Sequence, residues 1–167
     1  MWAGTANAGL MRIHRGWISS YSAASGLSSD DVNRLLIDRE GCLWVGTISG
    51  GLNRFKEGAF TTYSASGRGA RNFIFSLYQD VDGRILAGSA SGEVFALRGG
   101  RFEATDDLHY RFPGTVLTIC RDRDGSLWFG TPQGAFHAKK GKVVSYPLGF
   151  VTSIVYDRDG RMWIGSA

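Results

Sequence analysis

Pairs of acidic residues beside glycine are the first candidates for chemistry in this sequence. Three segments have the pattern Asp-x-Asp-Gly, at 80–83, 122–125 and 157–160, and a fourth reads Asp-Arg-Glu-Gly at 38–41. Alternating carboxylates can begin a calcium loop, but that loop also needs further oxygen ligands and a glutamate at its twelfth position. These segments lack those ligands, so we interpret them as tight turns, in which aspartate accepts from backbone N–H groups and glycine adopts a positive φ.

Histidine and cysteine give no pattern typical of a metal site or a catalytic nucleophile. The three histidines, His14, His109 and His137, are scattered along the chain, and Cys42 and Cys120 have no CxxC or Cys/His spacing. No Ser-His-Asp set can be assembled from spacing alone. We therefore expect no catalytic residue, no metal and no cofactor, and we expect the two thiols to be buried or idle.

The elements that position these residues follow from an internal repeat. The four acidic turns begin at residues 38, 80, 122 and 157, and are therefore spaced by 42, 42 and 35 positions. Each turn is followed at a constant offset by an apolar run that ends in glycine and a small residue, and a fifth such run opens the chain. A period in this range is typical of propellers and other repeat architectures.

Within one period the sequence predicts four short strands. In the second repeat they cover 32–38, 43–48, 52–56 and 60–64, each rich in β-branched and aromatic residues and bounded by turn residues. Short connections between consecutive strands favour an antiparallel meander. The fold class is therefore all-β, a β-propeller of four-stranded antiparallel blades with a 42-residue repeat.

The expected blade boundaries divide the chain into a partial blade at 1–25, three blades at 26–67, 68–109 and 110–146, and a partial blade at 147–167. The chain thus begins and ends with the second strand of a blade. We expect a fragment of about four blades; in the alternative, a strand at 151–157 completes the first blade and closes a four-bladed ring. Bulky residues recur on each second strand (Trp2, Trp44, Leu86, Trp128 and Trp163), and we expect them to fill the space between neighbouring blades.

Composition and charge exclude several classes of function. The chain has 43% hydrophobic residues, 24 glycines, a net charge of +4 and a pI near 9.3. The basic residues form no continuous run, so we expect no nucleic acid partner. No apolar stretch is long enough to insert in a membrane, and the first residues do not resemble a signal peptide.

Two connections between blades break the repeat in sequence while keeping its length, which suggests that packing does not dictate them. They lie at 66–73 and 106–113, on the face where binding loops of a rigid scaffold are expected. Their charged, amide and aromatic side chains suit an oligosaccharide or an acidic ligand. The candidate ligand-binding residues are Arg71, Asn72, Phe73, His109, Tyr110 and Arg111; the alternative is a pair of solvated loops, each with one aromatic residue tucked beneath it.

One combination of segments resembles the two-component regulator propeller repeat. It consists of residues 26–32, 38–47 and 50–55, and the middle segment has a close copy at 122–131. This resemblance implies paired seven-bladed propellers in a periplasmic sensor region, followed by a membrane span and a histidine kinase or diguanylate cyclase. We therefore expect a non-enzymatic ligand-sensing propeller whose partners are a small molecule or oligosaccharide and other blades of the same receptor, and a dimer stays open. The alternatives are a protein-interaction scaffold and, more weakly, an enzyme similar to the streptogramin lyase propellers.

Overall fold

The computed structural model describes residues 1–64, 73–104 and 111–167, which form five antiparallel sheets. The first sheet contains β1 (Trp2–Gly4), β2 (Leu10–His14) and β3 (Trp17–Tyr21), followed by the short 3-10 helix η1 (Ala23–Ser25). The second contains β4 (Val32–Ile37), β5 (Leu43–Thr47), β6 (Leu52–Lys56) and β7 (Ala59–Tyr63), and the third β8 (Ile74–Gln79), β9 (Ile85–Ser89), β10 (Val94–Arg98) and β11 (Arg101–Ala104). The fourth contains β12 (Thr118–Arg121), β13 (Leu127–Thr131), β14 (Gly134–Lys139) and β15 (Lys142–Tyr146), and the fifth β16 (Val151–Tyr156) and β17 (Met162–Ser166).

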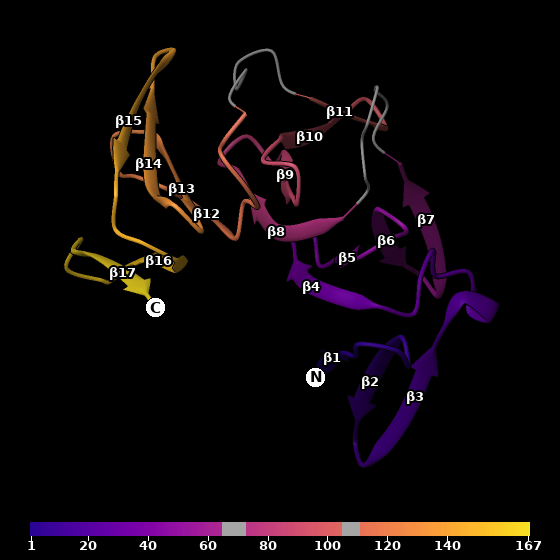
Figure 1. The fold of residues 1–167 in the computed structure, drawn as a ribbon. Coiled ribbons are helices and arrows are strands. Elements are labelled where there is room, and N and C mark those ends of the chain that lie inside the picture. Colours follow the sequence, from indigo (N-terminus) through magenta and orange to yellow (C-terminus); the bar gives the residue numbers. More distant parts are fainter. Residues whose placement is uncertain (65–72, 105–110) are drawn as a thin grey trace.

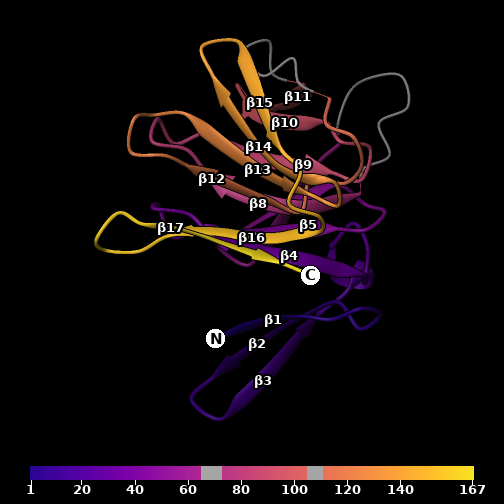
Figure 2. The same cartoon turned by 60° about the vertical axis from the view of Figure 1, so that its left-hand side comes forward.

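The predicted four-stranded propeller blades are confirmed. In the second sheet every strand end lies within one residue of its predicted position. The five sheets follow one another along an open arc, with strands β4, β8, β12 and β16 on its inner side (Figure 1). Figure 2 shows the molecule from a second direction, in which β16 and β17 are again separate from β1, β2 and β3.

The alternative of a closed four-bladed ring is not what the structure contains. Strand β16 pairs with β17, and β1 pairs with β2. Among the described residues, no strand is added to the free edge of β1 in the first sheet.

The acidic segments form the turns between the first two strands of each blade, as predicted. In each turn the glycine N–H donates to the carbonyl of the first aspartate, at 3.0 Å between Gly41 and Asp38 and 3.1 Å between Gly125 and Asp122. The turn glycines have φ values of 80–87°, a conformation that suits glycine.

The type of the turns between the third and fourth strands was not identified from the sequence. They contain two successive residues with positive φ: Arg15–Gly16, Glu57–Gly58, Gly99–Gly100 and Lys140–Gly141. Two positive φ values characterise the type I′ hairpin, whose twist matches that of the flanking strands. A charged residue at the first of these positions is unusual for type I′, which explains why sequence signals for a hairpin were weak here.

The glycine at the end of each second strand provides room for the next blade. A Cβ atom on Gly46 would lie 2.7 Å from Cγ2 of Ile74, and one on Gly130 would lie 2.8 Å from Cγ1 of Val151. The partner of the glycine is the β-branched residue that precedes or begins the inner strand of the following blade.

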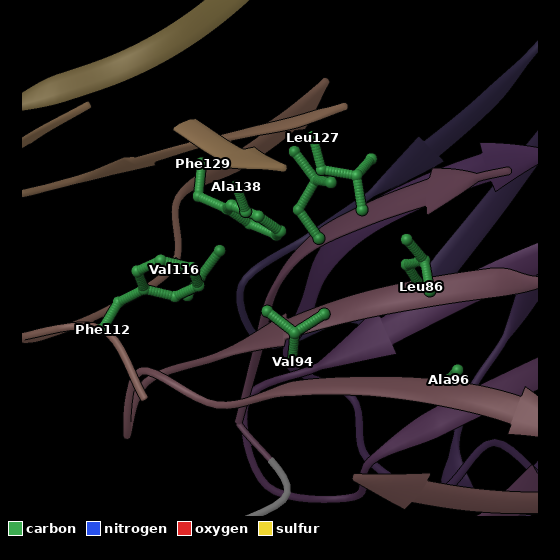
Figure 3. Packing of buried hydrophobic residues seen from close by; sticks show 9 residues of the cluster. Leu86, Val94, Ala96, Phe112, Val116, Leu127, Phe129 and Ala138 are labelled. Carbon is green, nitrogen blue, oxygen red and sulfur yellow. The ribbon is translucent and has the colours of Figure 1, made fainter. Parts of the chain in front are cut away.

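In the second and third blades the bulky residue on the second strand packs against the next blade, as expected. Trp44 lies in one buried cluster with Ile74 and Phe95 of the third sheet. Leu86 lies in a cluster with Val116 and Phe129 of the fourth blade, and Figure 3 shows these side chains facing one another between the sheets. Trp163 of the last sheet is 58% exposed.

Candidate functional site

The turn aspartates have a second role, which is to hold the indole of the recurring tryptophan. The Nε1 atom of Trp44 donates to Oδ2 of Asp38 at 2.7 Å, and both side chains are buried. The equivalent bonds join Trp128 to Asp122 at 3.2 Å and Trp163 to Asp157 at 2.9 Å. Our sequence analysis missed this contact, although the constant six-residue spacing between Asp and Trp was a visible signal of it.

The third blade departs from this arrangement because Leu86 stands where the others carry tryptophan. Its turn aspartate, Asp80, is completely buried, and no indole is present to bond to it. Instead, Arg84 donates to Oδ2 of Asp80 at 2.9 Å, and Arg121 of the fourth sheet donates to the same atom at 2.6 Å. Burial alone would raise the pKa of Asp80, but the hydrogen bonds from Arg121 and Arg84 outweigh it and leave that pKa below its usual value.

Arginines join neighbouring sheets at the same end of the molecule. The guanidinium of Arg39 in the second blade donates to the carbonyl of Val81 in the third at 3.2 Å, and that of Arg123 reaches the carbonyl of Arg158 at 3.5 Å. In the third blade the residue equivalent to Arg39 and Arg123 is Val81, whose side chain cannot donate. At this junction Arg121 of the fourth sheet instead donates back to Asp80 of the third. Sequence reasoning gave these arginines no role, since the contacts depend on how blades are placed in space.

Of the six candidate ligand-binding residues, Arg71, Asn72, His109 and Tyr110 lie outside the described residues. The other two meet at one loop of the third blade, between β9 and β10. The carbonyl of Phe73 accepts from the N–H of Ala90 at 3.0 Å, and Nε of Arg111 donates to the carbonyl of Ser91 at 3.4 Å. Phe73 is half-buried, whereas Arg111 is exposed.

The loop that meets these two residues is itself polar and well ordered by hydrogen bonds. The hydroxyl of Ser91 donates to Oε2 of Glu93 at 2.7 Å, and the N–H of Glu93 donates to Oγ of Ser89 at 3.1 Å. Phe112, next to Arg111, is 4% exposed and packs on Phe129 with ring centroids 4.5 Å apart. One aromatic residue thus anchors the segment and leaves Arg111 at the surface beside a hydroxyl and a carboxylate.

The fold brings together a serine, a histidine and an aspartate that spacing did not connect. The Oγ atom of Ser126 lies 2.6 Å from Nε2 of His137 and donates to Oδ1 of Asp124 at 2.5 Å. In a catalytic triad the carboxylate binds the second nitrogen of the histidine, whereas here it binds the serine. Ser126 is buried and His137 stacks on Trp128 at 4.3 Å between ring centroids, so this cluster serves the packing of the fourth sheet.

Two groups of side chains have the composition of metal ligands. They are Asp38, Glu40 and Cys42, and Asp122, Asp124 and His137. One carboxylate in each group already has protein partners: Asp38 accepts from the N–H of Cys42 at 2.7 Å, and Asp124 is bonded by Lys139 and Ser126. These bonds account for both groups as turn structure.

The two cysteines are free thiols, as expected from the sequence. Cys42 is buried beneath its turn and Cys120 is half-buried on β12. Burial raises the pKa of the Cys120 thiol, and the nearby Asp122 carboxylate raises it further. A thiol held in its protonated form is a poor nucleophile and a poor metal ligand.

Three segments match the sequence model of a family described as "two component regulator propeller": 26–49, 111–133 and 145–167. Together they include the turn and second strand of the second, fourth and fifth sheets. A comparison with curated protein sequences finds no match. Within the described residues, no helix has the length and apolar character needed to cross a bilayer.

Solved structures with the same fold include the extracellular domain of a protein described as a hybrid two-component system from B. thetaiotaomicron, at 20% identity and a TM-score of 0.84. That alignment covers 99% of this chain and 24% of the other, so the chain spans about a quarter of its length. A catalytically inactive virginiamycin B lyase from Staphylococcus aureus with quinupristin is also similar, at 16% identity and a TM-score of 0.76 over 98% of this chain and 58% of the lyase. A gluconolactonase from Xanthomonas campestris aligns at 15% identity with a TM-score of 0.66, over 95% of this chain and 62% of the enzyme.

Proposed function

Because this chain is built from two-component regulator propeller repeats, we propose that it is a non-enzymatic ligand-sensing segment of a bacterial signalling receptor. In this proposal it lies in the periplasm, where its ligand is a small molecule or an oligosaccharide. Its remaining partners are further blades of the same receptor. The likeness to an extracellular domain of a two-component system supports this assignment.

The observation that carries the proposal is the meeting of two irregular blade connections at one polar loop. Phe73 and Arg111 come from different connections, and they contact the consecutive residues Ala90 and Ser91. Residues from separate connections are therefore held at the same loop, Phe73 through its main-chain carbonyl and Arg111 through its side chain. The exposed guanidinium would bind an acidic or hydroxyl-rich ligand through charge-assisted hydrogen bonds.

Signalling would follow from a difference in affinity between two packings of the propeller. A ligand that binds one arrangement of neighbouring blades more tightly shifts the population toward it, and only by as much as the affinities differ. Phe112 ties Arg111 directly to the buried contact between the third and fourth sheets. Ligand contacts at Arg111 would in this way act on the packing of two blades.

Binding of the purified chain to an array of neutral and uronic-acid-containing oligosaccharides tests the proposal. We expect binding to at least one oligosaccharide, and we expect Arg111→Ala to weaken it about tenfold, as for loss of a charge-assisted hydrogen bond. Arg158→Ala, which removes an exposed arginine from the turn at the opposite end of a sheet, is the matched control and should leave binding unchanged. Absence of binding to the whole array, or equal binding by Arg111→Ala, would overturn the proposal.

The lyase-type fold neighbours define the test of the enzymatic alternative. Quinupristin, the compound present with the virginiamycin B lyase, is incubated with the purified chain and followed by mass spectrometry. We expect the compound to remain intact. Its conversion by the wild-type chain would replace the non-enzymatic assignment with a lyase.

A further inference from the structure

A cleft of about 210 Å³ lies between the third and fourth sheets, beside the Asp80 cluster. Its floor is apolar, formed by Leu127 and Ala138, which belong to the buried cluster shown in Figure 3. Four basic residues line it: Arg84 from the third sheet, Arg121 from β12, and Lys139 and Lys140 from the end of β14 and its turn. The cleft opens at the end of the molecule opposite to the loop that Arg111 contacts.

The acidic groups in and beneath this cleft do not neutralise its cations. Asp80 is bonded to Arg84 and Arg121, Asp82 pairs with Arg84 at 2.7 Å, and Asp124 pairs with Lys139. Lys140 has no carboxylate partner in the part of the chain that the structure describes, and Asp124 is the single acidic residue among those that line the cleft.

Arg121 leaves a donor uncompensated beside the same cleft. Its Nη2 atom bonds Asp80 and its Nη1 atom bonds the carbonyl of Gly125 at 2.7 Å. Its Nε atom is buried, and among the described residues it has no hydrogen-bond partner. Two of its three nitrogens are therefore held by protein acceptors, which fixes the guanidinium beside the cleft.

The corresponding cleft between the first and second sheets provides an internal comparison. It has a volume of about 420 Å³ and is lined by two basic residues, Arg12 and Lys56, and two acidic residues, Glu40 and Glu57. Glu57 and Lys140 occupy the same place in their turns, with φ values of 52° and 48°. The excess of basic residues is therefore a property of the cleft between the third and fourth sheets, and the cleft between the first and second sheets does not share it.

We propose that the cleft between the third and fourth sheets binds an oxyanion group of the phosphate or sulfate type. Its volume is below the roughly 300–1,000 Å³ of pockets that enclose whole drug-sized ligands, so it accommodates a single charged group. Lysine binds phosphate as a point charge, and an apolar floor strengthens that attraction because it lowers the local dielectric constant. This site is separate from the sensing loop and stands whether or not oligosaccharide binding is found.

Nuclear magnetic resonance titration with inorganic phosphate, repeated with inorganic sulfate, tests the proposal on the whole 167-residue chain. Sodium chloride holds the ionic strength constant, because surface charge effects depend on salt. We expect saturable shifts of the backbone amides of Gly125, Ser126 and Gly141, with a dissociation constant in the millimolar range. Response to phosphate alone or to sulfate alone would identify which oxyanion the cleft prefers, and either supports the site.

A charge-reversal variant in the turn at Lys140 distinguishes a specific anion site from a general attraction of anions to a positively charged protein. Lys140→Glu introduces the residue that the equivalent turn already carries at Glu57, so the turn geometry is retained. We expect it to weaken phosphate binding at least about tenfold, because a like charge then faces the anion. Lys142→Glu changes the net charge equally but lies outside the cleft, and it should leave binding nearly unchanged.

The reciprocal variant keeps the test decisive if Lys140→Glu does not fold. Glu57→Lys leaves Glu40 as the single acidic residue lining the first–second cleft, and we expect new saturable shifts at Gly41 and Gly58. Absence of saturable shifts in the wild type would overturn the proposal. Equal weakening by Lys140→Glu and Lys142→Glu would overturn it as well, since the attraction would then be general.

Discussion

At the scale of single residues, Asp80 differs from the other turn aspartates in the groups that donate hydrogen bonds to its carboxylate. In the other blades a neutral indole N–H bonds the turn aspartate, and a tryptophan fills the junction. In the third blade two guanidinium groups replace that single bond, one of them from the next sheet. A contact within one blade has thus become an ionic contact between two blades.

Asp80→Asn is expected to destabilise the chain by up to about 3 kcal/mol near neutral pH, because removal of one partner leaves buried positive charge uncompensated. The folded-state pKa of Asp80 is below its usual value. Its ionised form therefore stabilises the fold above the unfolded-state pKa, near 3.9, and this stabilisation is lost as pH falls through that value toward the folded pKa. Urea unfolding between pH 2.5 and 7, with Asp80→Asn showing a shallower decline in unfolding free energy below about pH 4, checks both statements.

Asp82→Asn is the matched control for this prediction. Its carboxylate also pairs with Arg84, but its side chain is 51% exposed, and exposed ion pairs contribute about 0–1 kcal/mol. A loss of stability as large as that of Asp80→Asn would show that burial is not the source of the effect.

At the scale of strands and turns, the sequence was sufficient wherever the signal was local and repeated. Short runs rich in β-branched and aromatic residues, together with the repeated Asp-x-Asp-Gly turns, predicted the strands and the antiparallel meander. The conformation of the third-to-fourth-strand turns was not predicted, because Arg15, Glu57 and Lys140 adopt positive φ, where glycine or asparagine is the usual signal.

Contacts between blades could not be derived in the same way. Whether Arg121 reaches Asp80 depends on the angle and distance between two sheets, which no local pattern encodes. The meeting of Phe73 with Arg111 at one loop has the same origin. The candidate ligand-binding residues came from departures from the repeat, and they stay a prediction.

Gly46→Ala tests the packing between strands of neighbouring blades. The added methyl group would lie 2.7 Å from Cγ2 and 3.0 Å from Cβ of Ile74, which is too close for carbon atoms. Overpacking of this kind costs about 1–3 kcal/mol, and we expect a corresponding fall in the thermal midpoint. In Gly165→Ala the nearest atom is Oγ of Ser153, a side-chain end that can rotate away, so the loss should be clearly smaller.

At the scale of the whole molecule, each sheet packs against its immediate neighbours along the arc (Figure 1). Stability in such arrays is close to a sum of repeat and neighbour terms. The third sheet is covered on both faces by buried clusters, whereas Trp17 of the first sheet is 80% exposed and Trp163 of the last is 58% exposed.

Native-state hydrogen exchange should therefore show graded protection along the arc. We expect the amides of β9 and β10 to exchange only through global unfolding, and those of β3 and β17 to exchange through local opening of lower free energy. Mass-spectrometric exchange at increasing urea concentrations measures the difference. Uniform protection across all five sheets would mean that the chain opens as a single unit, contrary to this view.

The glycine on each second strand has a consequence for how such molecules can change in size. In each junction a glycine of one blade leaves room for a β-branched side chain of the next blade. Gly46 faces Ile74 in this way, and Gly88 faces Val116. The glycine and the β-branched residue of each contact belong to neighbouring repeats, and the same pair of residue types recurs from one junction to the next. Duplicating or deleting a whole repeat would therefore recreate this glycine contact, whereas the Asp80–Arg121 ion pair belongs to one junction and would have to be rebuilt.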